Sequence, residues 1–255
     1  MGFVFFSLAT LPDAGPEEHR EYNKWHQLDH RPENLNLPGV EYGDRWGRPA
    51  EFKAAGTGND TLGDTDYVTM YWYHEPFDES YRQWNDLGET SFQWGRGPLI
   101  PGVERRMLAF FRIVKGYAAA SSLVSPEVLK YRPNQGIHFL LTRHQKHHSL
   151  DTHTHYTWTD RVLMPGLMEV DGVAGGYTFS FSHFQKHSTM NFNTPDEDAA
   201  SSMRVRLLYL DGDPLATTER IAAAEEQLAR NADCGDAGEV LLSTPVKTII
   251  PFQDW

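Results

Sequence analysis

The chain has 255 residues, which is enough for one large domain or for two domains of roughly 100 to 150 residues each. Its 35 acidic residues outnumber its 23 Lys and Arg residues, so the formal net charge of -12 argues against nucleic acid or an anionic membrane surface as a partner. Cys234 is the only cysteine, which excludes an intrachain disulfide and a thiolate metal cluster and favours a cytoplasmic location.

The pattern of the first half predicts the order strand, helix, strand, strand, helix, strand. The apolar run 3–9 is too short to cross a bilayer and is expected to form the first strand. A helix should begin at Pro16 and run to about Arg31, where Pro32 must end or kink it because proline lacks a backbone donor. The remaining elements are expected at 39–46, 67–73, 77–87 and 107–114.

The second half predicts the same order of elements. They are expected at 137–141, around Trp158, and at 173–184, 204–210, 217–231 and 245–250. The predicted domains are therefore 1–115 and 136–255, joined by a linker at 116–135. Residues 190–201 are rich in acids and Asn and are expected to form an exposed loop.

An internal repeat supports this division into two halves. Four residues recur at one spacing, as Trp25, Pro32, Gly39 and Val40 in the first stretch and as Trp158, Pro165, Gly172 and Val173 in the second. Such self-similarity indicates that one βαββαβ unit occurs twice. A sheet with both helices on one face leaves its other face apolar, and the second sheet is the obvious cover for it.

The first helix and the turn after it carry the pattern W-x4-H-x-P-x5-PGV. This arrangement resembles the dimeric α+β barrel superfamily of ferredoxin-like domains, and within it EthD-type proteins, over about the first 115 residues; the matching residues are Trp25, His30, Pro32, Pro38, Gly39 and Val40. The resemblance implies an α+β fold in which two tandem ferredoxin-like halves pack their antiparallel sheets into an α+β barrel. The space between the two sheets, open at the ends or beside the first helix, is then the expected pocket for a small apolar ligand.

The second half departs from this pattern. Leu163 stands where His30 stands in the first half, and Thr159 stands where His26 does. We therefore expect the second half to keep the fold and to have lost the polar residues.

The candidate catalytic residues are His30, His26 and Asp29. The two histidines are four residues apart, so they share one face of the helix, and an imidazole with a pKa near neutrality can transfer a proton. Asp29 or His26 would orient His30. The alternative is that one histidine is on the surface and the other caps the helix end.

The candidate substrate-binding residues are mostly aromatic. Tyr71 and Tyr73 alternate with Trp72 along one strand, so one of the two rows should face the barrel. Further candidates are a phenol one turn before His26, a Trp–Arg pair after the second helix and a histidine in an otherwise apolar strand: Tyr22, Trp94, Arg96 and His138. Arg96 would clamp a carboxylate. Core packing is the alternative for most of the aromatic residues.

The His-rich strip 143–156 is expected to be a solvated loop between a strand and a helix. His144 and His148 have helical spacing, and His153 and His155 would share a face of a strand, but no carboxylate accompanies them in a known metal motif. No metal site is predicted. Since no nucleotide-binding motif is found either, no cofactor is expected.

The leading hypothesis is a cofactor-independent catabolic enzyme of the lyase, isomerase or dehydratase type. It would act by His-mediated proton transfer on a small apolar molecule, for which an aromatic compound is one candidate, and a homodimer is one candidate assembly. One alternative is a haem-binding enzyme of the tandem α+β barrel type, with His153, His155 or His183 as the axial residue. Another is a non-catalytic protein that binds an apolar ligand.

Overall fold

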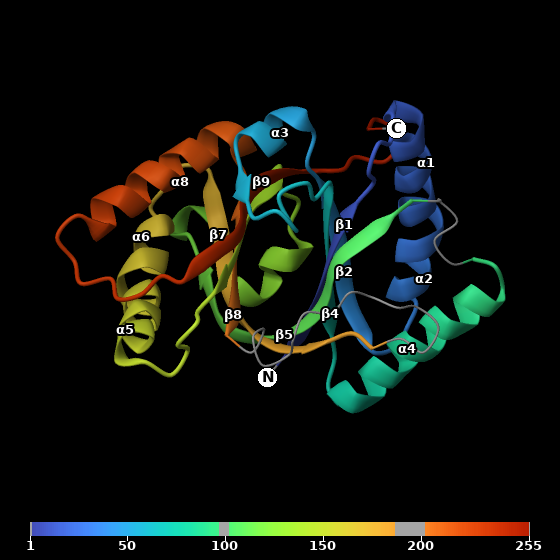
Figure 1. Cartoon of the computed structure of the whole chain (residues 1–255), viewed down its shortest axis with the longest axis horizontal. Coiled ribbons are helices and arrows are strands. Elements are labelled where there is room, and N and C mark those ends of the chain that lie inside the picture. Colours follow the sequence, from blue (N-terminus) through green and yellow to red (C-terminus); the bar gives the residue numbers. More distant parts are fainter. Residues whose placement is uncertain (1, 97–101, 187–201, 255) are drawn as a thin grey trace.

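The first half of the chain contains the predicted elements and several short additions (Figure 1). The computed structural model describes residues 2–96, 102–186 and 202–254, so the loop expected at 190–201 lies outside the described residues. The elements are β1 (Phe3–Thr10), α1 (Pro16–Trp25), the π-helix η1 (His26–His30), α2 (Arg31–Leu35), β2 (Val40–Gly47), α3 (Ala50–Ala54), β3 (Thr57–Gly58), β4 (Tyr67–Tyr73), α4 (Phe77–Gln93) and β5 (Glu104–Ala118).

Two short 3-10 helices, η2 (Ala120–Ser122) and η3 (Pro126–Tyr131), lead into the second half. Its elements are β6 (Gly136–Arg143), α5 (Leu150–Trp158), the π-helix η4 (Thr159–Leu163), α6 (Met164–Leu167), β7 (Val173–Phe184), β8 (Met203–Leu210), α8 (Pro214–Ala229) and β9 (Glu239–Thr248).

Eight of the described strands close into a barrel. The hydrogen-bonded order is β2-β4-β1-β5 in the first half and β7-β8-β6-β9 in the second, which in both is the order of a ferredoxin-like βαββαβ unit. β5 pairs with β7, and β2 pairs with β9, so the two antiparallel sheets join at both edges. The predicted α+β barrel is confirmed. The predicted boundary at residue 115 falls inside β5, and the division into domains stays a prediction.

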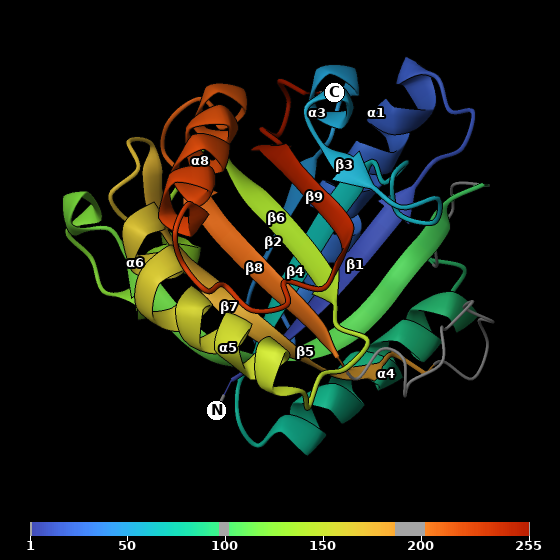
Figure 2. The ribbon, with the colours of Figure 1, turned by 60° about the vertical axis from the view of Figure 1, so that its left-hand side comes forward.

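The helices cover the outside of the barrel in two groups. α1, α2 and α4 lie over the outer face of the first sheet, and α5, α6 and α8 lie over the outer face of the second (Figures 1 and 2). Each group therefore encloses a space between helices and sheet. Within the described ranges, no helix has both the length and the apolar character needed to cross a bilayer.

The sequence predicted that Pro32 would end or kink the first helix, and Pro32 does not end it. α1, η1 and α2 follow one another without a break, and the wide turn of η1 lets the backbone N–H of Arg31 bond to the carbonyl of His26, five residues back. Pro32 has no backbone N–H to donate, and it directly follows this wide turn. The helix therefore continues through Pro32 into α2. The same device recurs in the second half, where η4 precedes Pro165.

The barrel interior is a core built by both sheets. Phe6 contacts Phe139 and Phe179 edge to face, with ring centroids 5.5 and 5.3 Å apart. Trp72 belongs to this interior cluster, whereas Tyr71 and Tyr73 point outward to the helices. The aromatic row that faces the barrel is thus that of Trp72, and apolar side chains pack the space where a pocket between the sheets was expected.

Two predictions about histidines are corrected. Ile137 and Phe139 point into the barrel, so the alternation of β6 turns His138 outward, away from the space between the sheets. The strip 143–156 is only in part a loop, because α5 begins at Leu150. His153 and His155 therefore lie on a helix and not on a strand.

Candidate functional site

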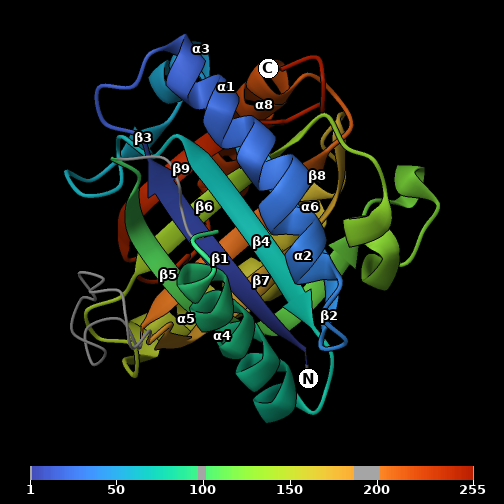
Figure 3. The ribbon, with the colours of Figure 1, turned by 90° about the vertical axis from the view of Figure 1, so that its right-hand side faces the viewer.

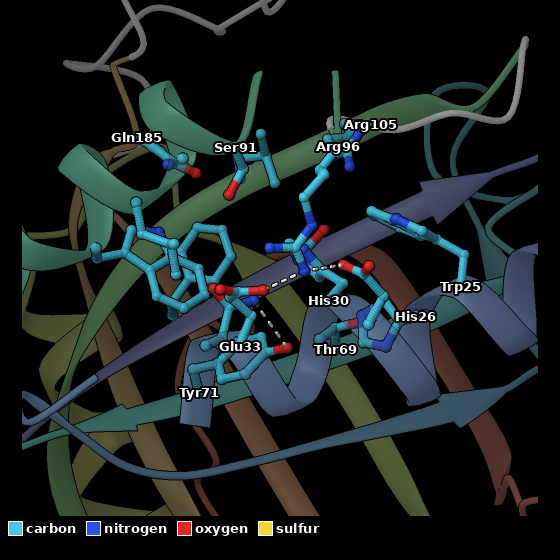
Figure 4. A pocket seen from close by; sticks show the side chains of 18 of the residues that line it. Trp25, His26, His30, Glu33, Thr69, Tyr71, Ser91, Arg96, Arg105 and Gln185 are labelled. Carbon is cyan, nitrogen blue, oxygen red and sulfur yellow. Dashed lines mark hydrogen bonds and ion pairs between the residues drawn. The ribbon is translucent and has the colours of Figure 1, made fainter. Parts of the chain in front are cut away.

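A small cavity of about 100 Å³ lies between the outer face of the first sheet and its helices (Figure 4). Figure 3 shows α1, α2 and α4 over that face of the sheet. The continuous helical segment α1-η1-α2 forms one wall, and β1, β4 and β5 form the floor. The end of α4 supplies the opposite wall, with Ser91, and Gln185 follows β7 at one side. The cavity therefore lies on the outer face of the sheet and not in the space between the sheets, where the sequence predicted the ligand pocket.

His26 and His30 both line this cavity. The π-helical turn places them in edge-to-face contact, with ring centroids 5.1 Å apart. Trp25 stacks on His30 at 4.8 Å. The His26 side chain is buried and its Nδ1 atom has no hydrogen-bond partner among the described residues. His30 is therefore held in position by ring contacts rather than by a carboxylate.

Both imidazoles are neutral at physiological pH. Burial, followed by the charges of Arg105, Arg45 and Arg96, lowers the pKa of His30 to about 3. Burial and the charge of Arg45 also hold the pKa of His26 well below its usual range. Desolvation and nearby cations disfavour the protonated form of an imidazole. His30 is thus an unprotonated base and not a charged acid in the free protein.

One source of this positive field is a buried arginine behind the helix. Arg45 is completely buried on β2 and donates a hydrogen bond of 2.8 Å to the amide oxygen of Asn23. Its guanidinium lies over the rings of Tyr22 and Tyr67, 4.7 and 3.9 Å from their centroids. Cation–π contacts stabilise the charge without neutralising it, so its field reaches the histidines.

A second arginine joins the two walls of the cavity. Arg96, just after α4, contacts Asp29 of η1 at 2.9 Å and also forms an ion pair with Glu33 of α2 (Figure 4). Asp29 is thus directed to Arg96. Because its guanidinium is already paired with both carboxylates, Arg96 links the two walls of the cavity by ion pairs.

Arg105 differs from Arg96 in having no acidic partner. It lines the same cavity from β5, and its side chain forms no ion pair or hydrogen bond with the residues that the structure describes. Its charge is the largest electrostatic contribution to the lowered pKa of His30. The cavity therefore combines a neutral base with an unpaired cation, which suits an anionic ligand.

The floor of the cavity is held by a close approach of two strands. Tyr71 of β4 accepts a hydrogen bond of 3.4 Å from the side chain of Asn34. A Cβ atom on the neighbouring Gly43 of β2 would lie 2.3 Å from the Tyr71 ring, so only glycine leaves that ring its place. Burial raises the pKa of Tyr71 far above its usual value, and the phenol stays protonated.

The structure brings six of the ten predicted site residues to this cavity, namely Tyr22, His26, Asp29, His30, Tyr71 and Arg96. The other four do not line it. Tyr73 packs under α4 with Trp84, and Trp72 points into the barrel. Trp94 is 62% exposed, and His138 lies on the outer face of the second sheet. All ten residue roles stay predictions.

The sequence analysis missed Arg105, Arg45 and Gln185. Arg45 lies in a strand that was expected to be structural, and Arg105 lies just before the strand expected at 107–114. Nothing in their spacing relates them to His30. The one usable signal was Glu33, four residues after Asp29, because this spacing places two carboxylates on one helical face. A cation facing that pair was therefore foreseeable, although its identity was not.

The histidines proposed as axial ligands of haem do not share one place. His153 is exposed on α5, and His183 of β7 stacks on Phe110 of the first half at 4.9 Å. His155 alone among these three lines a cavity, one of about 770 Å³ in the second half. In the described ranges, no group of three or more His, Cys, Asp or Glu side chains is arranged to hold a metal ion.

Solved structures share the fold of this chain, although no protein-family model and no curated protein matches its sequence. An anthrone oxidase-like protein superposes with a TM-score of 0.52 at 12% identity, covering 97% of this chain and 91% of that one. A candidate chlorite dismutase gives a TM-score of 0.55 at 10% identity, covering 98% and 95%. A candidate monooxygenase from Fusobacterium nucleatum gives 0.50 at 7% identity, covering 97% and 94%.

At these identities the likeness extends to the fold alone. The resemblance to dimeric α+β barrel proteins is confirmed at that level, because the match spans nearly the whole of both chains. The EthD-type assignment, the origin of the two halves by duplication and the homodimer stay predictions.

Proposed function

We propose that this chain is a cofactor-independent enzyme of the lyase or isomerase type that uses His30 as a general base on a small organic anion. The observation that carries the proposal is the neutral imidazole of His30 in one cavity with the guanidinium of Arg105, which has no acidic partner among the described residues. A neutral imidazole accepts a proton, and a cation beside it stabilises the negative charge that the substrate then develops.

The expected reaction is proton removal next to a carbonyl group. The C–H bond of the substrate breaks, its proton moves to an unprotonated ring nitrogen of His30, and the electron pair forms an enolate. Arg105 stabilises the enolate oxygen. Return of the proton to another atom completes an isomerisation, and loss of a leaving group from the enolate completes an elimination. No oxidant or reductant is needed for either outcome.

The substrate should carry a negative charge before it reacts. A base whose pKa is about 3 is weak, and the causes are burial of the ring first and then the field of three arginines. A bound carboxylate beside Arg105 opposes that field and raises the pKa of His30 toward the range where it is an effective base. The enzyme would thus be activated by an anionic substrate and not by a neutral analogue.

The walls limit the size of the substrate. The aromatic lining includes Trp25, Tyr71 and Trp84, and the cavity of about 100 Å³ has room for the reacting end of a molecule but not for a whole ring as well. An aromatic α-keto acid with one ring therefore has the expected charge and acidic C–H group, with its ring toward the open side of the cavity.

The first experiment is deuterium incorporation into the methylene group of phenylpyruvate in D₂O, followed by NMR. We expect the native protein to accelerate exchange over buffer, and we expect His30→Gln to lose this acceleration by a factor of about 10² to 10⁴. His148→Gln, which removes an exposed histidine, is the matched control and should behave as the native chain.

Two outcomes would speak for the alternatives. Binding of phenylpyruvate without exchange, unchanged in His30→Gln, would favour a non-catalytic binding protein. The haem alternative would depend on His155, whose Nδ1 lies 2.9 Å from the carbonyl oxygen of Cys234, an arrangement compatible with an axial imidazole. Bound haem would supply redox chemistry at its iron, and an absorbance titration with hemin tests for it.

A further inference from the structure

A larger cavity lies in the second half, where the polar residues were expected to be lost. It has a volume of about 770 Å³ and is lined by residues of the outer face of the second sheet, of α5, of η4 and of α8. Figure 2 shows α5 and α8 over that face of the sheet. This cavity occupies the same place in its half as the His30 cavity does in the first. Trp158 and Thr159 line it, as Trp25 and His26 line the other cavity, 133 positions earlier in the chain.

Small side chains make this second cavity wide. Ala222 and Ala229 of α8 face Thr178 and Ser180 of β7 across it, whereas the first cavity is narrowed by large rings such as Trp84. Leu140, Trp158 and Leu163 give it apolar walls. A body of two or three rings, or a long aliphatic chain, fits such a space.

Among the residues that the structure describes, one cation of this cavity has no acidic partner. Arg206 forms an ion pair with Glu225, and Asp160 is bound by Lys115 and Tyr117, both at 2.6 Å. The guanidinium of Arg204 instead lies over the ring of Tyr156, 4.7 Å from its centroid.

Within the described part of the chain, the side chain of Arg204 donates one hydrogen bond, to the carbonyl of Met203 at 2.9 Å. Its guanidinium carries a full charge in a partly buried position, and burial lowers its pKa without neutralising it. An anion bound beside Arg204 would give its guanidinium back the electrostatic stabilisation that burial removes.

Two histidines complete the polar end. His144 is buried beside Tyr156, with ring centroids 5.1 Å apart, and its Nδ1 atom has no hydrogen-bond partner among the described residues. The ring of His155 lies 5.8 Å from that of His144. Burial lowers the pKa of both, so they offer neutral hydrogen-bonding groups next to the charge of Arg204.

We propose that this second cavity binds an amphipathic organic anion, with its carboxylate or sulfonate at Arg204 and its apolar body against α8. The ligand is larger than the substrate of the His30 cavity, because the volume is several times greater and the lining side chains are smaller. The proposal does not depend on catalysis by His30.

The test uses the whole chain and the fluorescent sulfonate 8-anilinonaphthalene-1-sulfonate. We expect saturable binding, displaced at least tenfold more effectively by 2-naphthoate than by naphthalene-2-carboxamide, which has nearly the same shape without the charge. Equal displacement by the two compounds would overturn the proposal, and this comparison needs no variant.

Variants then locate the site. Arg204→Gln should weaken 2-naphthoate binding at least tenfold, and Ser180→Phe should block it by filling the cavity. Arg132→Gln, which removes a surface cation paired with Asp211, is the control and should bind normally. Unchanged binding in folded Arg204→Gln, with folding checked by thermal unfolding, would contradict the proposal.

Hemin is the final arm of the test. A Soret shift that is lost in His155→Ala and is not competed by 2-naphthoate would overturn the proposal in favour of an iron porphyrin. Loss of phenylpyruvate exchange in His30→Gln with intact 2-naphthoate binding would show that the two cavities act separately.

Discussion

His30 and Arg105 line one cavity, and the guanidinium of Arg105 has no acidic partner among the described residues. Arg96 in the same cavity is neutralised by Asp29 and Glu33. The two arginines therefore have different roles. Arg96 links the walls of the cavity, and Arg105 is available to a ligand. It also explains why the pKa of His30 responds to Arg105 more than to Arg96.

Replacing Arg105 by Gln should therefore change ligand affinity and proton affinity together. We expect binding of benzoate, a ring with one carboxylate, to weaken about tenfold, as for loss of one charge-assisted hydrogen bond. The pKa of His30 should rise, because its largest electrostatic perturbation is removed. Calorimetry and NMR titration measure the two effects, and unchanged benzoate affinity would contradict the role of Arg105.

Replacing Arg96 by Met should change substrate binding while leaving the stability of the fold nearly unchanged. The pairs with Asp29 and Glu33 are partly exposed, so the melting temperature should change little. KM should rise severalfold with a smaller change in kcat, because the ion pairs that link the two walls of the cavity are lost. Arg20→Met, which breaks an exposed pair with Glu17 on α1, is the matched control. A large loss of stability without a change in KM would show that Arg96 is only structural.

His138 should make stability depend on pH. Burial lowers its pKa to about 3 in the folded chain, against an ordinary value near 6.5. Between these values the unfolded chain binds the extra proton, so the stabilisation is complete above about pH 6.5 and is lost as the pH falls.

The variant that isolates this effect is His138→Phe, which places in β6 the residue found at the equivalent Phe5 of β1. Between pH 7 and pH 5 the variant should lose about 2 kcal/mol less unfolding free energy than the native chain. Urea unfolding at both pH values measures this. Parallel losses in the two proteins would mean that His138 is protonated normally.

The strands could be predicted because the residue types within each run are those that strands favour. The run 67–73 is β-branched or aromatic at every position except Met70, and β4 has these bounds. The helix through Pro32 could not be predicted, because a π-helical turn is set by packing and leaves no mark on hydrophobic periodicity. Sequence rules treat such a proline as an end.

Only those parts of the site whose residues are close together in the sequence could be predicted. His26 and His30 share a helical face by spacing alone, and they do meet in the structure. Arg105 reaches His30 because β5 pairs with β1, a long-range contact that no local pattern reveals. His138 was expected to face inward, and a shift of one residue in strand register reverses such an assignment.

Gly43 offers a structural test of the cavity floor. Gly43→Ala would force the Tyr71 ring to move and should cost about 1 to 3 kcal/mol of stability, with a loss of exchange activity. Gly47→Ala on the same strand is the control, because its Cβ would meet Ile249 at an ordinary 3.5 Å. Equal stability of the two variants would show that the close contact with Tyr71 does not constrain the site.

The most direct test of the central claim is an NMR titration of the His30 ring in the native protein, with and without benzoate. We predict that free His30 stays neutral down to about pH 4 and that bound benzoate raises its pKa, since the anion opposes the field of Arg105. A His30 that titrates near pH 6.5 in the free protein, or that does not respond to benzoate, would contradict a neutral base activated by an anionic substrate.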